Sequence, residues 1–178
     1  LIALQLAMDR PDMVEALILL EPSFVSRPEL GAAFQQALGP VVEAYTSGSP
    51  GLAADRMLQV IDGPSYRSRL DAAFGPGWFD RSADALDMYF RSDLPAALGW
   101  TLTPRRASST RQPALIVVGE HTREEFAAVA EDVTRWLPAA TAVVIPGATH
   151  NVAACQPEAT AAAIVAFMPA IGRPAPEA

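Results

Sequence analysis

The sequence has a single cysteine, no long hydrophobic run and few basic residues, and each shortage excludes a class of protein. Because Cys155 has no second cysteine to pair with, the chain forms no internal disulfide, which favours a reducing, cytoplasmic environment. No apolar run reaches the roughly 18 uninterrupted residues of a membrane span, so we expect no membrane insertion. A formal charge of −7, with 13 basic residues scattered along the chain, argues against nucleic-acid binding, because neutralising phosphates requires a basic surface.

Hydrophobic residues are abundant: they make up 51% of the 178 positions, against 19% charged residues. This balance excludes a disordered chain and allows one sizeable core, in one domain or in one domain with an insertion. The chain enters directly into the apolar segment 1–8, which has neither a helix N-cap nor the basic front of a signal peptide. Such a segment is typical of the middle of a buried helix, so we expect further residues to precede it.

Three short apolar runs predict three strands, at residues 14–20, 114–118 and 142–145. Because hydrophobicity is unbroken over such lengths, we expect each strand to be buried on both faces, as in a parallel sheet. A helix is expected between the second and third runs, where Thr122 and Glu125 have the spacing of a capping box with Thr122 as the N-cap. Strand, helix and strand would then form a right-handed βαβ unit.

Both ends of the sequence are predicted to be helical. The opening helix extends to about Arg10, and the last helix begins at Pro157. The apolar face of the last helix is expected to contain Ile164, Met168 and Ile171. Residues 172–178 are rich in proline and alanine and are expected to fray.

Residues 24–112 interrupt this alternation of strands and helices. They contain helical patches separated by Gly-Pro turns, at residues 30–38, 52–61 and 83–90. No strand-like run occurs among them. We therefore expect a helical insertion that lies on the sheet.

The order of these elements resembles that of the α/β-hydrolase family. An alanine-rich helix leads into a strand ending in Leu-Leu-Glu-Pro, and the helical insertion follows; next come a strand ending in Val-Val-Gly-Glu, a helix, and a strand ending in Pro-Gly-Ala-Thr-His. The resemblance extends to about Met168. It implies an α/β fold that is the C-terminal part of a hydrolase sheet, with a partial core at 1–23 and 113–178 and a helical cap at 24–112.

The resemblance also implies a catalytic role for His150. In this family the triad follows the order nucleophile, acid and histidine along the chain, and His150 stands where the histidine belongs. An imidazole suits the role because it titrates near neutral pH and can accept the proton of a nucleophile or of a water molecule. The alternative is a loop histidine with a purely local structural role.

The triad acid is less clear. The resemblance implies an aspartate at position 122, but Thr122 carries no charge and the capping box already explains it. Two carboxylates are candidates: Glu21 follows the first strand, where one group of haloalkane dehalogenases places its acid, and Glu120 lies in the usual loop but two residues early. A third possibility is that no carboxylate acts as the triad acid.

The nucleophile is missing from the sequence. The resemblance implies a Gly-x-Ser-x-Gly elbow, or an Asp or Cys variant, a few residues before Leu1, and the oxyanion hole would depend on the same region. Other candidates for chemistry are weak. Cys155 is expected to be an inert thiol, His121 and His150 are too few for a metal site, and no glycine-rich phosphate loop occurs, so no cofactor is expected. The serines that lack the paired glycines of an elbow include Ser23, Ser65 and Ser82.

The resemblance thus implies part of an esterase-like hydrolase for a small or medium apolar ester, or for a related acyl or halide substrate. His150 would act as general base, Glu21 or Glu120 would orient it, and the isolated chain would be inactive. The rival hypothesis is a non-catalytic binding or interaction module with a degenerate triad, which Thr122 favours. Because the strand at 14–20 lacks a neighbour, we also expect its apolar edge to self-associate or to bind a partner.

Overall fold

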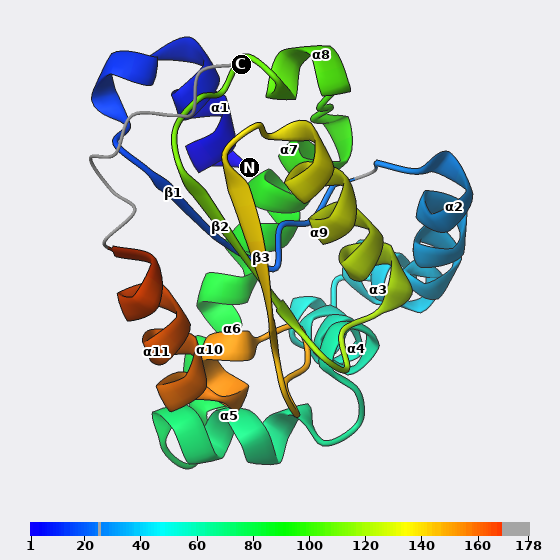
Figure 1. The fold of residues 1–178 in the computed structure, drawn as a ribbon. Coiled ribbons are helices and arrows are strands. Elements are labelled where there is room, and N and C mark those ends of the chain that lie inside the picture. Colours follow the sequence, from blue (N-terminus) through cyan, green and yellow to red (C-terminus); the bar gives the residue numbers. More distant parts are fainter. Residues whose placement is uncertain (25, 169–178) are drawn as a thin grey trace.

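The computed structural model describes residues 1–24 and 26–168, which form an α/β structure around a three-stranded parallel sheet (Figure 1). The strands lie in the order β1-β2-β3, with the bounds Leu17–Leu20, Ala114–Gly119 and Ala140–Ile145. The register pairs Leu17 with Ala114, and Ala114 with Ala140. The predicted fold class is confirmed. Because all three strands are parallel, their carboxyl ends share one edge of the sheet.

Burial differs between the three strands. Every residue of β2 is buried, whereas in β1 the side chains of Ile18 and Leu20 are 38% and 40% exposed, and in β3 Val144 is 56% exposed. The prediction of burial on both faces is therefore wrong for β1 and β3. Both are edge strands among the described residues, and helices cover their faces incompletely. Self-association through the edge of β1 stays a prediction.

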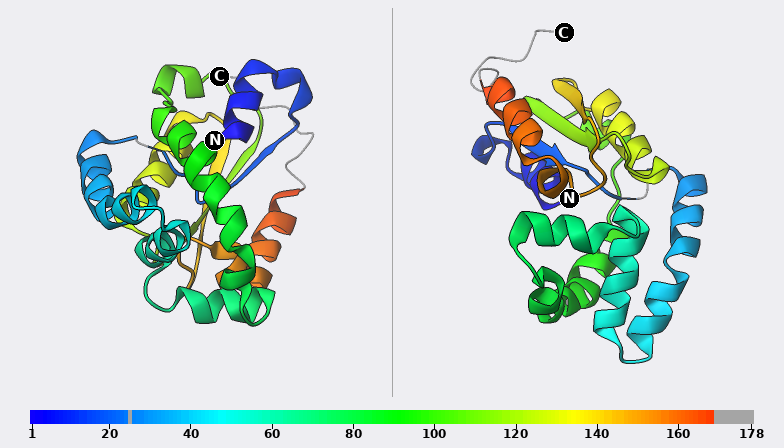
Figure 2. Two further views of the ribbon diagram at one scale, coloured as in Figure 1. Left: turned by 180° about the vertical axis from the view of Figure 1, so that it is seen from behind. Right: turned by 90° about the horizontal axis from the view of Figure 1, so that it is seen from below.

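Helices cover both faces of the sheet (Figures 1 and 2). On one face the buried side chains of β1 and β2, such as Leu19 and Ile116, pack with those of α1 (Ile2–Asp9), α8 (Pro104–Ala107) and α9 (Glu124–Trp136). On the other face Leu115 and Val117 pack with α10 (Val152–Cys155) and α11 (Pro157–Phe167). A short 3₁₀ helix, η1 (Pro11–Met13), links α1 to the approach of β1.

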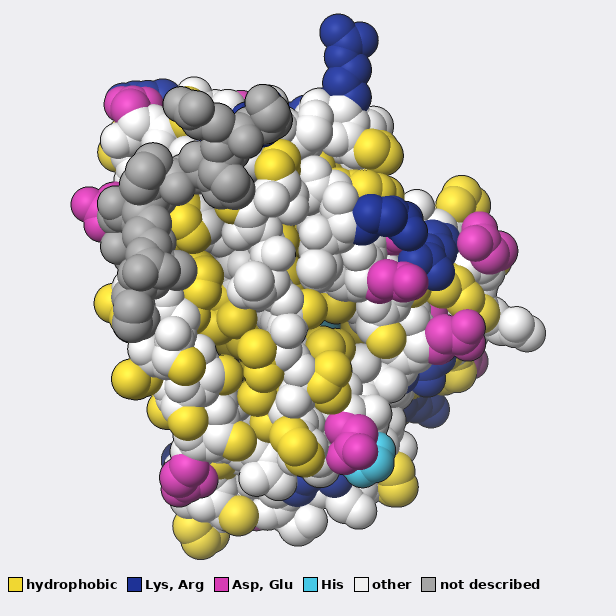
Figure 3. Space-filling model, viewed as in Figure 1, with side chains coloured by type: hydrophobic (Ala, Val, Ile, Leu, Met, Phe, Trp, Pro, Cys, Tyr) yellow, Lys and Arg dark blue, Asp and Glu magenta, His cyan; other side chains and the backbone are white. Residues whose placement is uncertain are grey.

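The face that carries β3 and α11 shows many hydrophobic side chains at its surface (Figure 3). Val144, Val165 and Met168 are all more than half exposed. The predicted apolar face of the last helix is thus wrong at Met168, because Phe167 and Thr160 make the buried contacts instead. Ile171 and the tail at 172–178 lie outside the described residues. No helix in the described part of the chain has the length and hydropathy of a membrane span.

A group of helices between β1 and β2 forms a second hydrophobic cluster, and we call this group the helical layer. Its members are α2 (Pro28–Ala37), α3 (Gly39–Thr46), α4 (Pro50–Asp62), α5 (Tyr66–Phe74), α6 (Trp78–Met88), the π-helix η2 (Tyr89–Asp93) and α7 (Leu94–Gly99). The three predicted helical patches correspond to α2, α4 and the α6–η2 segment. The Gly39-Pro40 turn instead begins α3, since proline is well tolerated in the first helical turn.

Figure 1 shows α4, α5 and α6 beyond the carboxyl ends of the strands. A partly buried ion pair joins the layer to the sheet helices: Arg27, just before α2, donates to the Asp132 carboxylate of α9 with an Nε–Oδ2 distance of 3.0 Å. Burial pushes the pKa of Asp132 up, but hydrogen bonds from Arg27 and Ser26 and the charge of Arg135 lower it overall. Asp132 therefore stays ionised, and its ion pair with Arg27 fixes the start of α2 against α9.

Candidate active site

Glu21 lies at the end of β1, in a backbone conformation that few residues other than glycine adopt. Its φ angle is +48°, its backbone N–H donates to the Val117 carbonyl of β2, and its side chain is buried. The carboxylate accepts hydrogen bonds from the Gly119 N–H at 2.6 Å and from the Thr122 hydroxyl at 2.8 Å. A buried carboxylate is stable only where such donors replace water, so the end of β2 is built to receive it.

The Thr122 hydroxyl does not cap α9, and the predicted capping box is wrong. Helix α9 begins after Arg123, with no side-chain capping bond, and Glu125 pairs with the Arg123 guanidinium at 2.7 Å. Thr122 donates to Glu21 instead. A hydrogen bond to an ionised acceptor is about twice as strong as one between neutral groups, so the buried carboxylate outcompetes the helix end.

This contact predicts a measurable effect on stability. Thr122→Val keeps the shape of the side chain and removes the hydroxyl, so we expect the free energy of unfolding in urea to fall by about 1.5–3 kcal/mol. Thr122→Ser, which keeps the hydroxyl, is the matched control and is expected to lose much less. Equal stability of the valine and serine variants would contradict the contact.

His150 lies in the loop between β3 and α10 and meets Glu21 from across the sheet edge. Its Nδ1 is 3.2 Å from Glu21 Oε2, although 129 positions separate the two residues in sequence. The imidazole packs against the Phe126 ring of α9, with a centroid distance of 4.2 Å and an interplanar angle of 36°, and its side chain is 17% exposed. An ionised carboxylate can only accept, so Nδ1 carries the hydrogen and Nε2 is left as an acceptor.

Gly119 makes the approach of the histidine loop possible. A Cβ atom at this position would lie 2.5 Å from the carbonyl oxygens of both Ala148 and Thr149. The His121 N–H also donates to the Ala148 carbonyl at 2.8 Å. The end of β2 thus binds Glu21 through the N–H of Gly119 and admits the backbone before His150 through its missing side chain.

The structure does not bring Glu120 to His150. The Glu120 carboxylate accepts the Gly147 N–H at 2.8 Å and lies 3.8 Å from Nε2 of His121, and its side chain is 53% exposed. Its contacts belong to the turn after β3. Of the two candidate acids, only Glu21 reaches the imidazole.

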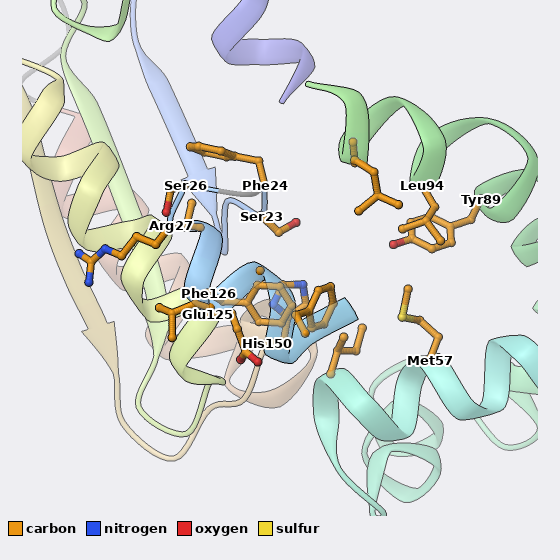
Figure 4. A pocket seen from close by; sticks show the side chains of 17 residues that line it. Ser23, Phe24, Ser26, Arg27, Met57, Tyr89, Leu94, Glu125, Phe126 and His150 are labelled. Atoms are coloured by element: carbon orange, nitrogen blue, oxygen red, sulfur yellow. The ribbon is translucent and has the colours of Figure 1, made fainter. Parts of the chain in front are cut away.

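A small apolar cavity of about 80 Å³ lies beside His150, between the helical layer and α9 (Figure 4). Its apolar wall includes Phe24, Phe34, Met57, Leu94, Phe126 and Val129. Figure 4 shows the hydroxyl oxygens of Ser23 and Tyr89 pointing into it from opposite sides. Burial, together with the charge of Asp93, raises the pKa of Tyr89, so its phenol keeps the proton and can donate to a bound molecule.

A larger open cleft of about 840 Å³ adjoins the site. It is bordered by the start of α1, by β1 and by η2, and its wall includes Leu1, Glu21, Ser23 and Tyr89. The N-terminus of α1 therefore opens onto the same space as the carboxylate that holds His150. A helix N-terminus carries partial positive charge and free N–H groups.

Comparisons with known proteins concern the fold. No known family matches the sequence, and no curated protein is similar to it in sequence. Solved structures do match nearly the whole chain. An α/β-hydrolase from Sphaerobacter thermophilus is 23% identical with a TM-score of 0.64, over 93% of this chain and 62% of that one. The chain has an α/β-hydrolase fold.

Two further solved structures match the chain with similar coverage and similarly low identity. MGS-M2, an α/β-hydrolase enzyme from a deep-sea metagenome library, is 18% identical with a TM-score of 0.67, over 94% of this chain and 61% of that one. The carboxylesterase CesB from Bacillus subtilis is 18% identical with a TM-score of 0.59, over 93% of this chain and 55% of that one. At such identities the likeness concerns the fold alone. The chain spans less than two thirds of the length of the structures it matches.

Of the remaining sequence candidates, Ser23 lines the cavity beside His150, whereas Ser65 and Cys155 have other surroundings. Ser65 precedes α5 without a side-chain capping bond, and Cys155 is half buried with its Sγ 3.2 Å from Thr149 Oγ1. Among the aromatic side chains of the helical layer, Tyr89 lines the cavity, whereas Phe79 and Phe90 pack inside the layer. No group of three or more His, Cys, Asp or Glu suited to a metal occurs within residues 1–24 and 26–168.

Sequence reasoning missed two residues that touch the histidine or its loop. Phe126 is one of the apolar residues of α9, and the helical spacing of these residues does not indicate a contact with an imidazole. Asp62 stands at the end of α4 before a Gly-Pro turn, and its carboxylate binds Thr149 and Asn151 on both sides of His150. A lone aspartate before a turn carries no pattern that points to such a contact.

Proposed function

We propose that this chain carries the histidine and the acid of a triad in an esterase-like hydrolase. The observation that supports it best is the contact of His150 Nδ1 with the buried Glu21 carboxylate, at the sheet edge where parallel α/β folds place reactive groups. Glu21 fixes the tautomer and stabilises the imidazolium that forms during the reaction. With Glu21 in this place, Thr122 no longer argues for a degenerate triad, and the non-catalytic alternative loses its main support.

The proton transfers follow from this geometry. As the nucleophile attacks the ester carbonyl, Nε2 of His150 accepts its proton, and the resulting imidazolium is stabilised by Glu21. The same proton then passes from Nε2 to the departing alcohol oxygen, which leaves an acyl-enzyme. Water then attacks the acyl-enzyme in place of the nucleophile: Nε2 accepts the proton of the water and returns it to the nucleophile, and the carboxylic acid is released.

The nucleophile would stand on an elbow before α1, as the resemblance to the family implies. The start of α1 borders the cleft that also contains Glu21 and Tyr89, so an elbow there would face His150. The oxyanion hole would come from the same region. Among the structures with this fold, CesB is described as a carboxylesterase. We place the enzyme in a reducing, cytoplasmic compartment, which suits its single cysteine.

The helical layer would act as the cap that selects the substrate and excludes water. Its cavity of about 80 Å³ is mostly apolar. One water molecule needs about 10–15 Å³ of such space, so the cavity has room for about six non-hydrogen atoms. We therefore propose a short, apolar acyl group as the part of the ester that binds there, with the Tyr89 phenol at its polar end.

A panel of p-nitrophenyl esters tests this proposal. The chain is expressed together with the coding sequence upstream of Leu1, and kcat/KM is measured for acetate, butyrate, hexanoate and dodecanoate. We expect the butyrate or hexanoate to be best and the dodecanoate to be at least about tenfold worse, since about 1.4 kcal/mol of lost fit is tenfold. Residues 1–178 alone are the control, with no turnover expected. Turnover by that control, abolished by a substitution within it, would contradict the proposal.

A further inference from the structure

The carboxylate of Asp62 joins the helical layer to the loop that carries His150. Its Oδ1 accepts the Thr149 hydroxyl at 2.7 Å and the Asn151 backbone N–H at 3.2 Å. Its Oδ2 accepts the side-chain amide of Asn151. The two residues that flank His150 are therefore both held by one side chain of α4.

The position of the Asp62 carboxylate would by itself lower the stability of the fold. The residue is 5% exposed and stands at the C-terminal end of α4, where the negative end of the helix dipole repels an anion. Arg69 does not pair with the carboxylate: its guanidinium donates to the backbone carbonyl of Asp62. The loop at 149–151 supplies the hydrogen bonds that compensate for this burial. We therefore attribute the position of the Asp62 side chain to its contacts with that loop.

A thiol holds the loop from the other direction. The Thr149 hydroxyl hydrogen is used by Asp62, which can only accept, so the Cys155 thiol at 3.2 Å must donate to the Thr149 oxygen. Cys155 belongs to α10, on the sheet side. Thr149 is thus fixed between the helical layer and the core.

We propose that Asp62 is a positioning residue, which aligns the His150 imidazole by holding both of its neighbours and makes that alignment depend on where α4 lies. The proposal rests on the function proposed above, in which His150 must face both Glu21 and the nucleophile. Displacement of α4 would release Thr149 and Asn151 together.

NMR of the chain 1–178 tests this inference without turnover. The protein has two histidines, and the Phe126 ring, with its centroid 4.2 Å from that of the imidazole, is expected to shift the ring-proton signals of His150 away from those of the exposed His121. Asp62→Ala is expected to collapse at least half of that separation, because the released loop lets the imidazole leave Phe126. Asp62→Asn is expected to preserve it, since one amide oxygen can accept from Thr149 and the Asn151 N–H while a flipped Asn151 amide accepts in return.

Asp55→Ala is the matched control. Asp55 lies on the same helix, and its carboxylate binds Tyr66 and Arg67 within the helical layer, so its loss should leave the His150 signals in place. If Asp62→Ala does not fold, the double variant Thr149→Val/Asn151→Ala must give the same collapse. Unchanged His150 signals in a folded Asp62→Ala protein would overturn the inference, and would leave the Glu21–His150 pair untouched. Failure of the pair itself would appear as unchanged turnover in Glu21→Gln.

Discussion

Replacing His150 by alanine in the protein that includes the upstream elbow is expected to lower kcat for a p-nitrophenyl ester by about 10⁴–10⁶-fold. Without the imidazole no group accepts the proton of the nucleophile or returns it to the leaving oxygen. The side chain lies in a loop beside a cavity, and its contacts are with the Phe126 ring and the Glu21 carboxylate, so its removal should leave the fold largely intact. Steady-state kinetics with circular dichroism of the variant measures both effects.

His121 is the matched control for this variant. It is the other histidine of the chain, lies at the end of β2 one loop away, and has a side chain that is 64% exposed. His121→Ala is expected to leave kcat within about twofold of the parent, because its exposed side chain lies outside the Glu21–His150 contact. Equal losses in the two variants, or an active His150→Ala protein, would contradict the assigned role.

Replacing Glu21 by glutamine is expected to lower kcat by about 10⁴-fold while the protein stays folded. The glutamine carbonyl can still accept the Gly119 N–H, but its amide group must then face His150 Nδ1 as a donor. Nδ1 becomes an acceptor, the hydrogen moves to Nε2, and the imidazole can no longer take a proton from the nucleophile. The expected loss of kcat thus comes from the changed tautomer of His150 and not from a change in packing.

Glu120→Gln provides the control for the loss of a carboxylate. Glu120 lies on the loop where the family commonly has its acid, yet it contacts Gly147 and not the imidazole. Its replacement is expected to leave kcat nearly unchanged. A large loss in Glu120→Gln with an active Glu21→Gln protein would reverse the assignment of the acid.

Much of the fold could be predicted because strong local signals agreed with the tertiary structure. The apolar run at 114–118 corresponds to β2, and β2 is buried on both faces as such runs imply. The same pattern misled at β1 and β3, since hydrophobicity of a strand says nothing about whether another strand or helix covers it. Ile18 is apolar and yet 38% exposed.

The site could be predicted only in part, for a related reason. His150 and Glu21 follow strand ends, and parallel strands bring their carboxyl ends to one edge, so their meeting is a consequence of topology. The role of Thr122 could not be found this way, because a local capping rule and a distant carboxylate competed for one hydroxyl. Asp62 meets the histidine loop across 87–89 positions of sequence, and only the packing of α4 creates that contact.

The most direct test of the account is the tautomer of His150 in the ¹⁵N-labelled chain 1–178 at mildly alkaline pH, where imidazoles are neutral. The contact with Glu21 predicts that Nδ1 carries the hydrogen and Nε2 is bare, and that Glu21→Gln moves the hydrogen to Nε2. The exposed His121 provides an internal reference, because it is a histidine outside the Glu21 contact. A His150 signal with the hydrogen on Nε2 in the unmodified protein, or one that Glu21→Gln leaves unchanged, would contradict the account.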